Sequence, residues 1–98
     1  MPHVIVALDK PGSASLRTEL RPAHLEHLTR HAAKLLAAGP MLAEDGTTPV
    51  GSMIVLDSDD RAEVDAFIDA DPYTKGGLFE TVTVRPWRKV FLAGARTG

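Results

Sequence analysis

Short apolar runs in the chain predict β-strands. Residues 4–8 are a continuous apolar run of strand length, which ends at a turn-forming Asp-Lys-Pro-Gly sequence. Residues 52–56 and 78–84 are two further runs, rich in β-branched and aromatic side chains. The run at 41–43 is shorter, but the polar loop 44–49 can join it to residues 52–56. These two segments therefore predict a β-hairpin.

Apolar residues at helical spacing predict a first helix over residues 22–38, after a short helical turn at 13–20. The residues that recur with a period of about 3.6 are Leu25, Leu28, Ala32, Leu35 and Leu36. Pro22 is expected at the first helical position, where its missing N–H costs least. Gly39 and Pro40 are expected to end this helix.

A second helix is predicted from a cap at Asp57 or Ser58 through Ala70, because acidic residues follow the cap and stabilise the positive helix end. Its core face is formed by Val64, Phe67 and Ile68. One more helical turn is predicted at residues 72–75, where Pro72 fits the first position.

The resulting order, βαββαβ, predicts an α+β ferredoxin-like fold with an antiparallel four-stranded sheet. Two helices can cover only one face of that sheet. The runs 4–8 and 52–56 are apolar at nearly every position, so both of their faces are expected to be buried. We therefore expect the uncovered face to pack against a second copy of the chain, as in a homodimeric α/β barrel.

Composition narrows the class of protein. The 98 residues are expected to form one domain, residues 1–98, in which residues 92–98 are a flexible tail. The absence of cysteine excludes disulfides, thiolate nucleophiles and zinc–thiolate sites. The first residues show neither a basic stretch nor an apolar segment long enough for a signal peptide or membrane span. We expect a cytoplasmic protein with no membrane partner.

Charge argues against nucleic acid as a partner. The net charge is −2, and residues 85–98 hold four basic residues and no acid, so the rest of the chain is acidic. Nucleic-acid binders usually carry a basic stripe and stacking aromatic residues, but this chain has only five Phe, Tyr and Trp residues. No phosphate-binding or dinucleotide fingerprint is present, and we expect no cofactor.

His24 and Asp71 are the candidate catalytic pair. If Pro22 begins a helix, His24 lies in its first turn, where the helix dipole keeps the imidazole neutral and able to act as a base. The alternative is a boundary histidine hydrogen-bonded to the backbone. Asp71 can cap the turn that begins with Pro72, accept a hydrogen bond from His24, or do both with its two oxygens.

The neighbouring histidines allow two interpretations. His24, His27 and His31 have the spacing i, i+3, i+7, so a metal site on one helix is geometrically possible. Zinc usually recruits ligands from more than one element, and nothing in the sequence identifies a fourth. We therefore expect no metal, and expect His27 and His31 to lie on a solvated face.

Other candidate residues are expected to contact a small-molecule ligand. Tyr73 and Trp87 are amphipathic aromatic residues that can line an apolar pocket and donate a hydrogen bond. Arg21 can stabilise a carboxylate or enolate. Ser52 has no neighbouring partner that would mark it as a nucleophile, and we assign it to substrate binding together with these three residues.

Several segments together resemble the YCII-related (YciI-like) family. They are residues 21–25, 38–41, 51–52, 69–73 and 84–91. The resemblance covers nearly the whole chain and implies a dimeric ferredoxin-like fold, similar to that of muconolactone isomerase, with a His and an Asp in a pocket. By motif these residues are His24 and Asp71. The family includes a protein that eliminates chloride from a chlorinated hydroxyhydroquinone.

Two functions follow from these observations. The first is a cofactor-independent enzyme in which His24 transfers a proton and Asp71 orients it, during elimination or isomerisation of a small cyclic or aromatic compound. The second is a non-catalytic dimeric module that binds a metabolite or a partner, with His24 and Asp71 structural. An open cavity that reaches the pair favours the enzyme.

Overall fold

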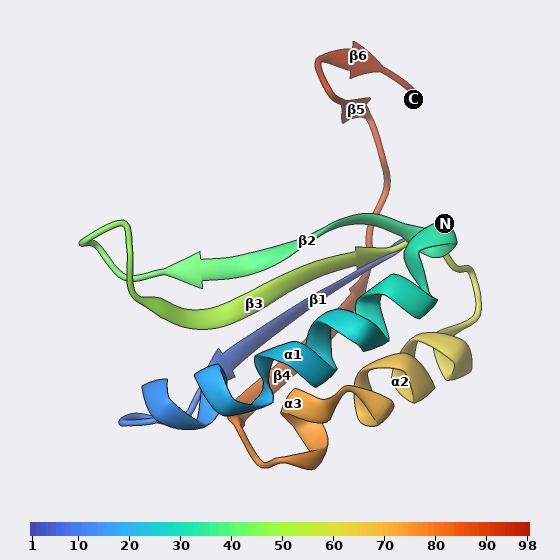
Figure 1. The fold of residues 1–98 in the computed structure, drawn as a ribbon. Coiled ribbons are helices and arrows are strands. Elements are labelled where there is room, and N and C mark those ends of the chain that lie inside the picture. The colour runs from blue at the N-terminus through green and yellow to red at the C-terminus, as the bar shows by residue number, and fades with distance from the viewer.

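The computed structural model describes residues 1–98 and has the predicted ferredoxin-like topology (Figure 1). A four-stranded antiparallel sheet has the order β2-β3-β1-β4. Its strands are β1 (His3–Asp9), β2 (Leu35–Leu42), β3 (Pro49–Leu56) and β4 (Phe79–Pro86). The helices are α1 (Ala14–Arg30), the 3-10 helix η1 (Ala32–Lys34), α2 (Arg61–Ala70) and α3 (Pro72–Lys75).

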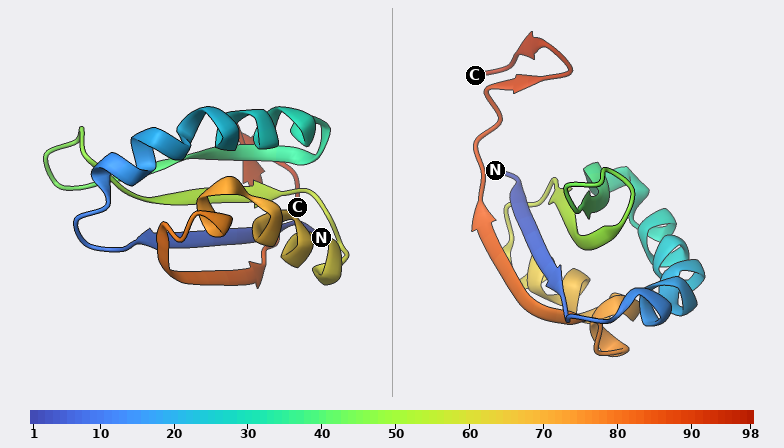
Figure 2. Two further views of the ribbon diagram at one scale, coloured as in Figure 1. Left: turned by 60° about the horizontal axis from the view of Figure 1, so that its bottom comes forward. Right: turned by 90° about the vertical axis from the view of Figure 1, so that its left-hand side faces the viewer.

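The helices lie on one face of the sheet, as predicted (Figure 2). Side chains of β1 alternate between the two faces, so Ile5 and Ala7 are fully buried beneath the helices while Leu8 is exposed. The main apolar cluster joins β1 and β3 to the predicted core face of α2. Its members are Ile5, Ile54, Leu56, Val64, Phe67 and Ile68.

The first helix differs from the prediction. It runs continuously through Ala14–Arg30 with Pro22 in its interior, and Leu35 and Leu36 belong to β2. Gly39 and Pro40 lie within that strand and do not end a helix. The prediction was wrong because apolar residues of two successive elements together mimic one helical period, whereas the buried side chains of α1 itself are all polar.

The start of α2 also differs from the prediction. Asp60, and neither Asp57 nor Ser58, caps the helix by accepting the backbone N–H of Ala62 at 2.9 Å. The hydroxyl of Ser58 accepts the backbone N–H of Asp60, which lies before the helix. The backbone N–H of Asp57 donates to the carbonyl of Lys34. The predicted turn Pro72–Lys75 is confirmed, with Asp71 as its cap.

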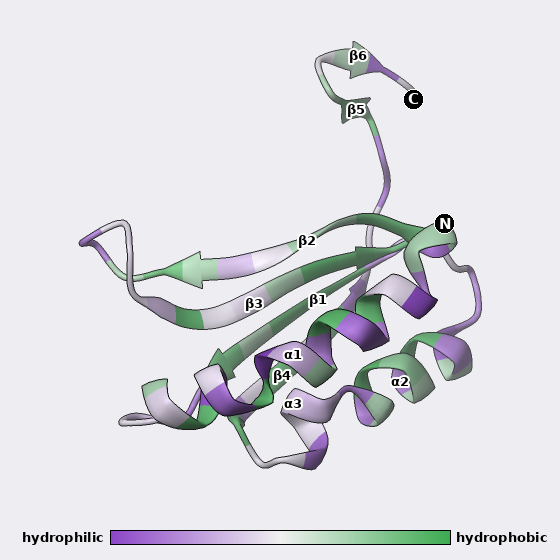
Figure 3. Ribbon diagram, viewed as in Figure 1, coloured by the Kyte–Doolittle hydropathy of each residue, from purple (hydrophilic) through white to green (hydrophobic).

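The sheet face opposite the helices is uncovered. It is apolar along the central strands β1 and β3, whereas β4 places Thr81, Thr83 and Arg85 on it. Side chains that lie on this face include Val4, Val6, Leu8 and Met53, and Leu8 and Met53 are 47% and 44% exposed. Figure 3 shows the hydrophobic character of β1 and of much of β3. In this protomer, both faces of β1 are therefore apolar but only one is buried.

The C-terminal segment leaves the sheet after β4. It forms a small hairpin from β5 (Phe91–Leu92) and β6 (Ala95–Arg96), which stands away from the rest of the chain (Figures 1 and 2). Phe91 is 59% exposed there. The flexibility of residues 92–98 stays a prediction. None of the helices has both the length and the apolar character needed to cross a membrane.

Candidate functional site

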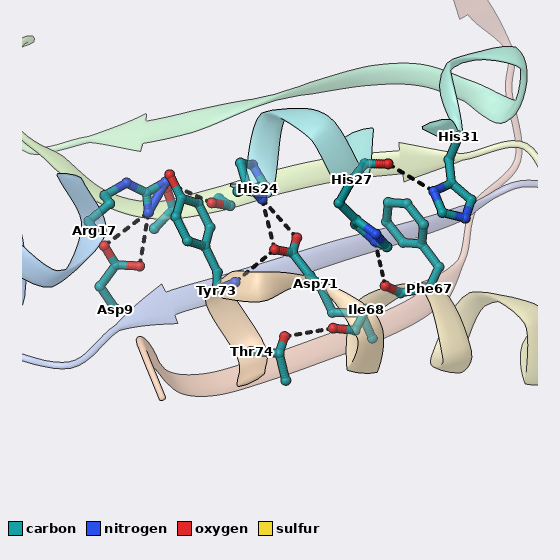
Figure 4. Close-up of polar contacts among 12 residues, drawn as sticks. Asp9, Arg17, His24, His27, His31, Phe67, Ile68, Asp71, Tyr73 and Thr74 are labelled. Carbon is teal, nitrogen blue, oxygen red and sulfur yellow. Dashed lines mark hydrogen bonds and ion pairs between the residues drawn. The ribbon is translucent and has the colours of Figure 1, made fainter. Parts of the chain in front are cut away.

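The side chains of His24 and Asp71 form a buried pair between α1 and the start of α3 (Figure 4). The Nδ1 atom of His24 lies 2.9 Å from both carboxylate oxygens of Asp71. Asp71 is fully buried and also accepts the backbone N–H of Tyr73 at 2.9 Å. Both roles considered for this aspartate, helix cap and partner of His24, therefore occur together.

This geometry determines which nitrogen of His24 is available. An ionised carboxylate only accepts hydrogen bonds, so Nδ1 must carry the proton and the neutral ring has its lone pair on Nε2. Nε2 has no hydrogen-bond partner within the protein. Every fully buried side-chain nitrogen and oxygen has such a partner, so Nε2 is not fully buried. Nε2 must therefore be reached from the adjacent cavity.

The position of His24 differs from the prediction, although its pairing agrees with it. His24 lies near the middle of the 17-residue helix α1 and not in the first turn. The field of a helix terminus weakens within about one turn, so the argument from the helix dipole does not apply to His24. Arg21, which precedes the proline expected to begin the helix, likewise lies within α1.

The ring of Tyr73 packs against one face of the His24 imidazole. Its ring stacks on His24 with the ring centroids 3.9 Å apart and the planes 13° from parallel. The Arg17 guanidinium lies 4.8 Å from the centre of the Tyr73 ring. Burial raises the pKa of the Tyr73 hydroxyl above its ordinary value, so the phenol stays protonated and can donate a hydrogen bond at neutral pH.

A cavity of about 280 Å³ opens beside this pair. Its walls come from α1, β2, β3 and α3, and the lining residues are Arg17, Thr18, Arg21, His24, Leu25, Leu28, Ala38, Gly39, Pro40, Pro49, Ser52, Ile54 and Tyr73. An apolar cavity of about 150 Å³ can hold benzene, so this space suits a compound with one substituted ring.

Three of the four predicted ligand contacts lie at this cavity. Arg21, Ser52 and Tyr73 line it together with His24, whereas Asp71 lies behind the imidazole. Trp87 is not among the lining residues, so the protomer does not bring it to the site. It follows β4, where its backbone N–H donates to the carbonyl of Pro2.

Arg17 is the site residue that sequence reasoning missed. It is 7% exposed, and one guanidinium nitrogen donates to both carboxylate oxygens of Asp9 at 3.1 and 3.2 Å. Another donates to the carbonyl of Gly51 and to the hydroxyl of Ser52, at 2.9 and 2.7 Å. Its spacing of i, i+4, i+7 with Arg21 and His24 would have revealed a shared helix face if α1 had been predicted as one helix.

His27 in α1 and His31, which directly follows that helix, do not form the solvated face that we expected. His27 is 4% exposed, and its Nε2 donates to the carbonyl of Phe67 at 2.9 Å. Burial lowers the pKa of His27 below its ordinary value. His31 is partly buried, and its Nδ1 donates to the carbonyl of His27. The structure contains no group of three or more His, Cys, Asp or Glu side chains placed to hold a metal ion.

Fold and site together define a ferredoxin-like α+β protein with a His–Asp pair beside a small cavity. The model of the YCII-related domain matches residues 1–88, and the chain belongs to this family. Protein YciI of Escherichia coli is 40% identical and aligns over 93% of this chain and all of its own length. An uncharacterized protein of Haemophilus influenzae is 33% identical with the same coverage.

Solved structures support the same relationship. The 5-chloro-2-hydroxyhydroquinone dehydrochlorinase TftG of Burkholderia phenoliruptrix, in complex with 2,5-dihydroxybenzoquinone, is 34% identical and superposes with a TM-score of 0.83. The match covers 90% of this chain and 94% of that chain. An antibiotic biosynthesis monooxygenase structure with 20% identity and a TM-score of 0.53, which covers 90% of this chain and 99% of its own, shares the fold.

Proposed function

We propose that this protein is a cofactor-independent enzyme that transfers a proton on a small cyclic or aromatic compound. His24 acts as the base and acid, and Asp71 holds its ring in the required tautomer. One observation carries the proposal. The Nε2 atom of His24 has no hydrogen-bond partner in the protein and is open to the cavity, while Nδ1 is held by the buried Asp71 carboxylate.

The chemistry requires a positioned base with a pKa near the working pH, which imidazole supplies. His24 Nε2 takes a proton from a ring carbon or hydroxyl of the substrate, and the released electron pair forms a new double bond. In an elimination the electrons leave with the departing group; in an isomerisation the proton returns to another atom of the ring system. Asp71 stabilises the imidazolium that forms between these steps.

The dehydrochlorinase relative supports this class of substrate. TftG acts on a chlorinated hydroxyhydroquinone and is seen with a dihydroxybenzoquinone bound. Its similarity extends over 90% of the present chain. The cavity of about 280 Å³ has room for one substituted ring of this kind. Fold similarity does not transfer the substrate itself, so the proposal is limited to the class of reaction.

The proposal is tested by incubating the protein in D₂O with hydroxylated one-ring compounds, including 5-chloro-2-hydroxyhydroquinone under anaerobic conditions. NMR would follow deuterium entry into the ring, and an electrode would follow chloride release. We expect the wild-type protein and a His31→Gln control to be active and His24→Gln to lose activity. Equal rates in wild type and His24→Gln, or no reaction with the whole set, would contradict the proposal.

We also propose that the protein works as a homodimer formed through the uncovered sheet face. Leu8 and Met53 are exposed on that face beside Val4 and Val6. Exposed apolar side chains gathered on one face are typical of an interaction site. The alternative function, a binding module without catalysis, predicts the same dimer, so the dimer alone does not decide between the two.

A further inference from the structure

The cavity next to His24 contains one uncompensated positive charge. Arg17 and Arg21 both line the cavity, but the Arg17 charge is balanced by Asp9. Arg21 makes no ion pair within 4.0 Å and no side-chain hydrogen bond. No Asp or Glu lines the cavity, and the Asp71 carboxylate lies behind the His24 ring, where it accepts the Nδ1–H.

Ser52 adds a hydrogen-bond donor beside this charge. Its hydroxyl oxygen accepts a hydrogen bond from Arg17 at 2.7 Å, and it donates to no acceptor in the protein. Because a hydroxyl has one hydrogen and can rotate, the Ser52 O–H remains free to donate to a ligand. Arg17 therefore positions Ser52 without itself needing to touch the ligand.

The Tyr73 hydroxyl is a third donor at the same cavity. This hydroxyl has no hydrogen-bond partner within the protein. Every fully buried side-chain oxygen has a partner, so the Tyr73 hydroxyl is not fully buried and must be accessible from the cavity. The charges of Arg17 and Arg21 act on this hydroxyl, and those of Asp71 and Asp9 act on it in the opposite direction. In Figure 4 the ring extends from α3 toward Arg17.

From this arrangement we propose that the cavity binds its ligand as an anion. An ionised oxygen on one ring, either an acidic enol or phenol oxygen or a carboxylate, sits on Arg21 and Ser52 and is held beside His24. Hydrogen bonds from charged donors to ionised oxygens are stronger than neutral ones. The inference rests on the proposed function for the role of His24, but the charge preference of the cavity is independent of catalysis.

The experiment measures binding by calorimetry with two matched pairs of probes. The first pair is 2,5-dihydroxybenzoquinone, which is ionised at neutral pH, and its neutral dimethyl ether; the second is benzoate and benzamide. We expect at least one anion to bind tenfold or more tightly than its neutral partner. The pair that shows the preference identifies whether an enolate-type oxygen or a carboxylate is the preferred group.

Arg21→Gln is the decisive variant, because the side chain is exposed and its removal leaves no buried partner. The preference for the anion should disappear in Arg21→Gln and persist in Arg30→Gln, a control on the same helix away from the cavity. If neither anion binds better than its neutral partner, or if Arg21→Gln keeps the preference, the inference is wrong.

A second variant separates this inference from the proposed function. His24→Gln should keep the preference for the anion while losing deuterium exchange. Loss of exchange without any anion preference in the wild type would contradict only the inference. An anion preference together with full activity of His24→Gln would contradict only the proposed function.

Discussion

Asp71 combines a structural and a site role in one fully buried side chain. Its carboxylate accepts the backbone N–H of Tyr73 and so caps the start of α3. It also accepts the Nδ1–H of His24 and so orients the imidazole. A single residue thereby holds the start of α3, which carries Tyr73, and the ring of His24, on which Tyr73 stacks. Stability and chemistry at this site are therefore linked.

Replacing Asp71 by Ala should destabilise the protein by about 2–4 kcal/mol, since it removes a helix cap and leaves a buried donor without a partner. Asp60→Ala is a matched control that removes only a cap from α2, with an expected cost of about 1 kcal/mol. Urea unfolding of both variants measures the difference. Equal losses would mean that the link to His24 contributes no stability.

His27 should make folding sensitive to mild acid. Burial lowers its pKa in the folded protein, and the nearby charges that act on it are Asp71, His31 and His24. The unfolded chain then binds more protons than the folded protein below the unfolded pKa of about 6.5. The stabilising effect of the neutral buried ring is complete above that pH and is lost as the pH falls toward the lowered folded value.

Urea unfolding at pH 7.5 and pH 5.5 would measure this effect. We expect the wild type to lose unfolding free energy between these pH values, and His27→Gln to lose less. Gln can still donate a hydrogen bond to the Phe67 carbonyl, so the comparison isolates the titration of the ring. The same pH dependence in both proteins would assign the effect to other groups.

Some of these residue roles could be read from the sequence and some could not. Pro72 directly after Asp71 predicts the cap, because proline favours the first helical position. The contact between His24 and Asp71 spans 47 residues, so local spacing only made it a possibility, which the family resemblance favoured. Arg17 has partners 8, 34 and 35 residues away, and only the tertiary fold brings them together.

At the scale of elements, α1 is the least predictable part of the fold. Its buried residues Arg17, His24 and His27 are polar, so no apolar stripe reveals the helix or its face. Pro22 in its interior then suggested a boundary that does not exist. By contrast, α2 carries the apolar face that the sequence predicts, and β1 and β3 were predicted from simple apolar runs.

The interior proline gives a direct test of this helix. Pro22 lacks an N–H and removes one backbone hydrogen bond from α1, which costs a helix up to about 3 kcal/mol relative to Ala. Pro22→Ala should therefore raise the unfolding free energy by about 1–3 kcal/mol. The midpoint of urea unfolding measures it, and a lower midpoint would mean that Pro22 makes favourable contacts that outweigh the missing bond.

At the scale of the whole molecule, the single protomer leaves a sheet face uncovered, with the apolar side chains of Leu8 and Met53 exposed on its central strands. Light scattering of the wild type at micromolar concentration should give the mass of a dimer. Met53→Glu would place a charge in the middle of that face and should give a monomer. Ala66→Glu, on the exposed side of α2, should remain a dimer. A monomeric wild type would contradict the proposed association.

The central claim is that His24 presents an unprotonated Nε2 to the cavity because Asp71 holds the proton on Nδ1. Long-range ¹H–¹⁵N NMR of the imidazoles, with His24→Gln to assign the signals, reports the tautomer of each neutral ring. We predict the Nδ1–H form for His24 in the wild type and a shift toward the Nε2–H form in Asp71→Asn. A neutral His24 protonated on Nε2 in the wild type would contradict the account.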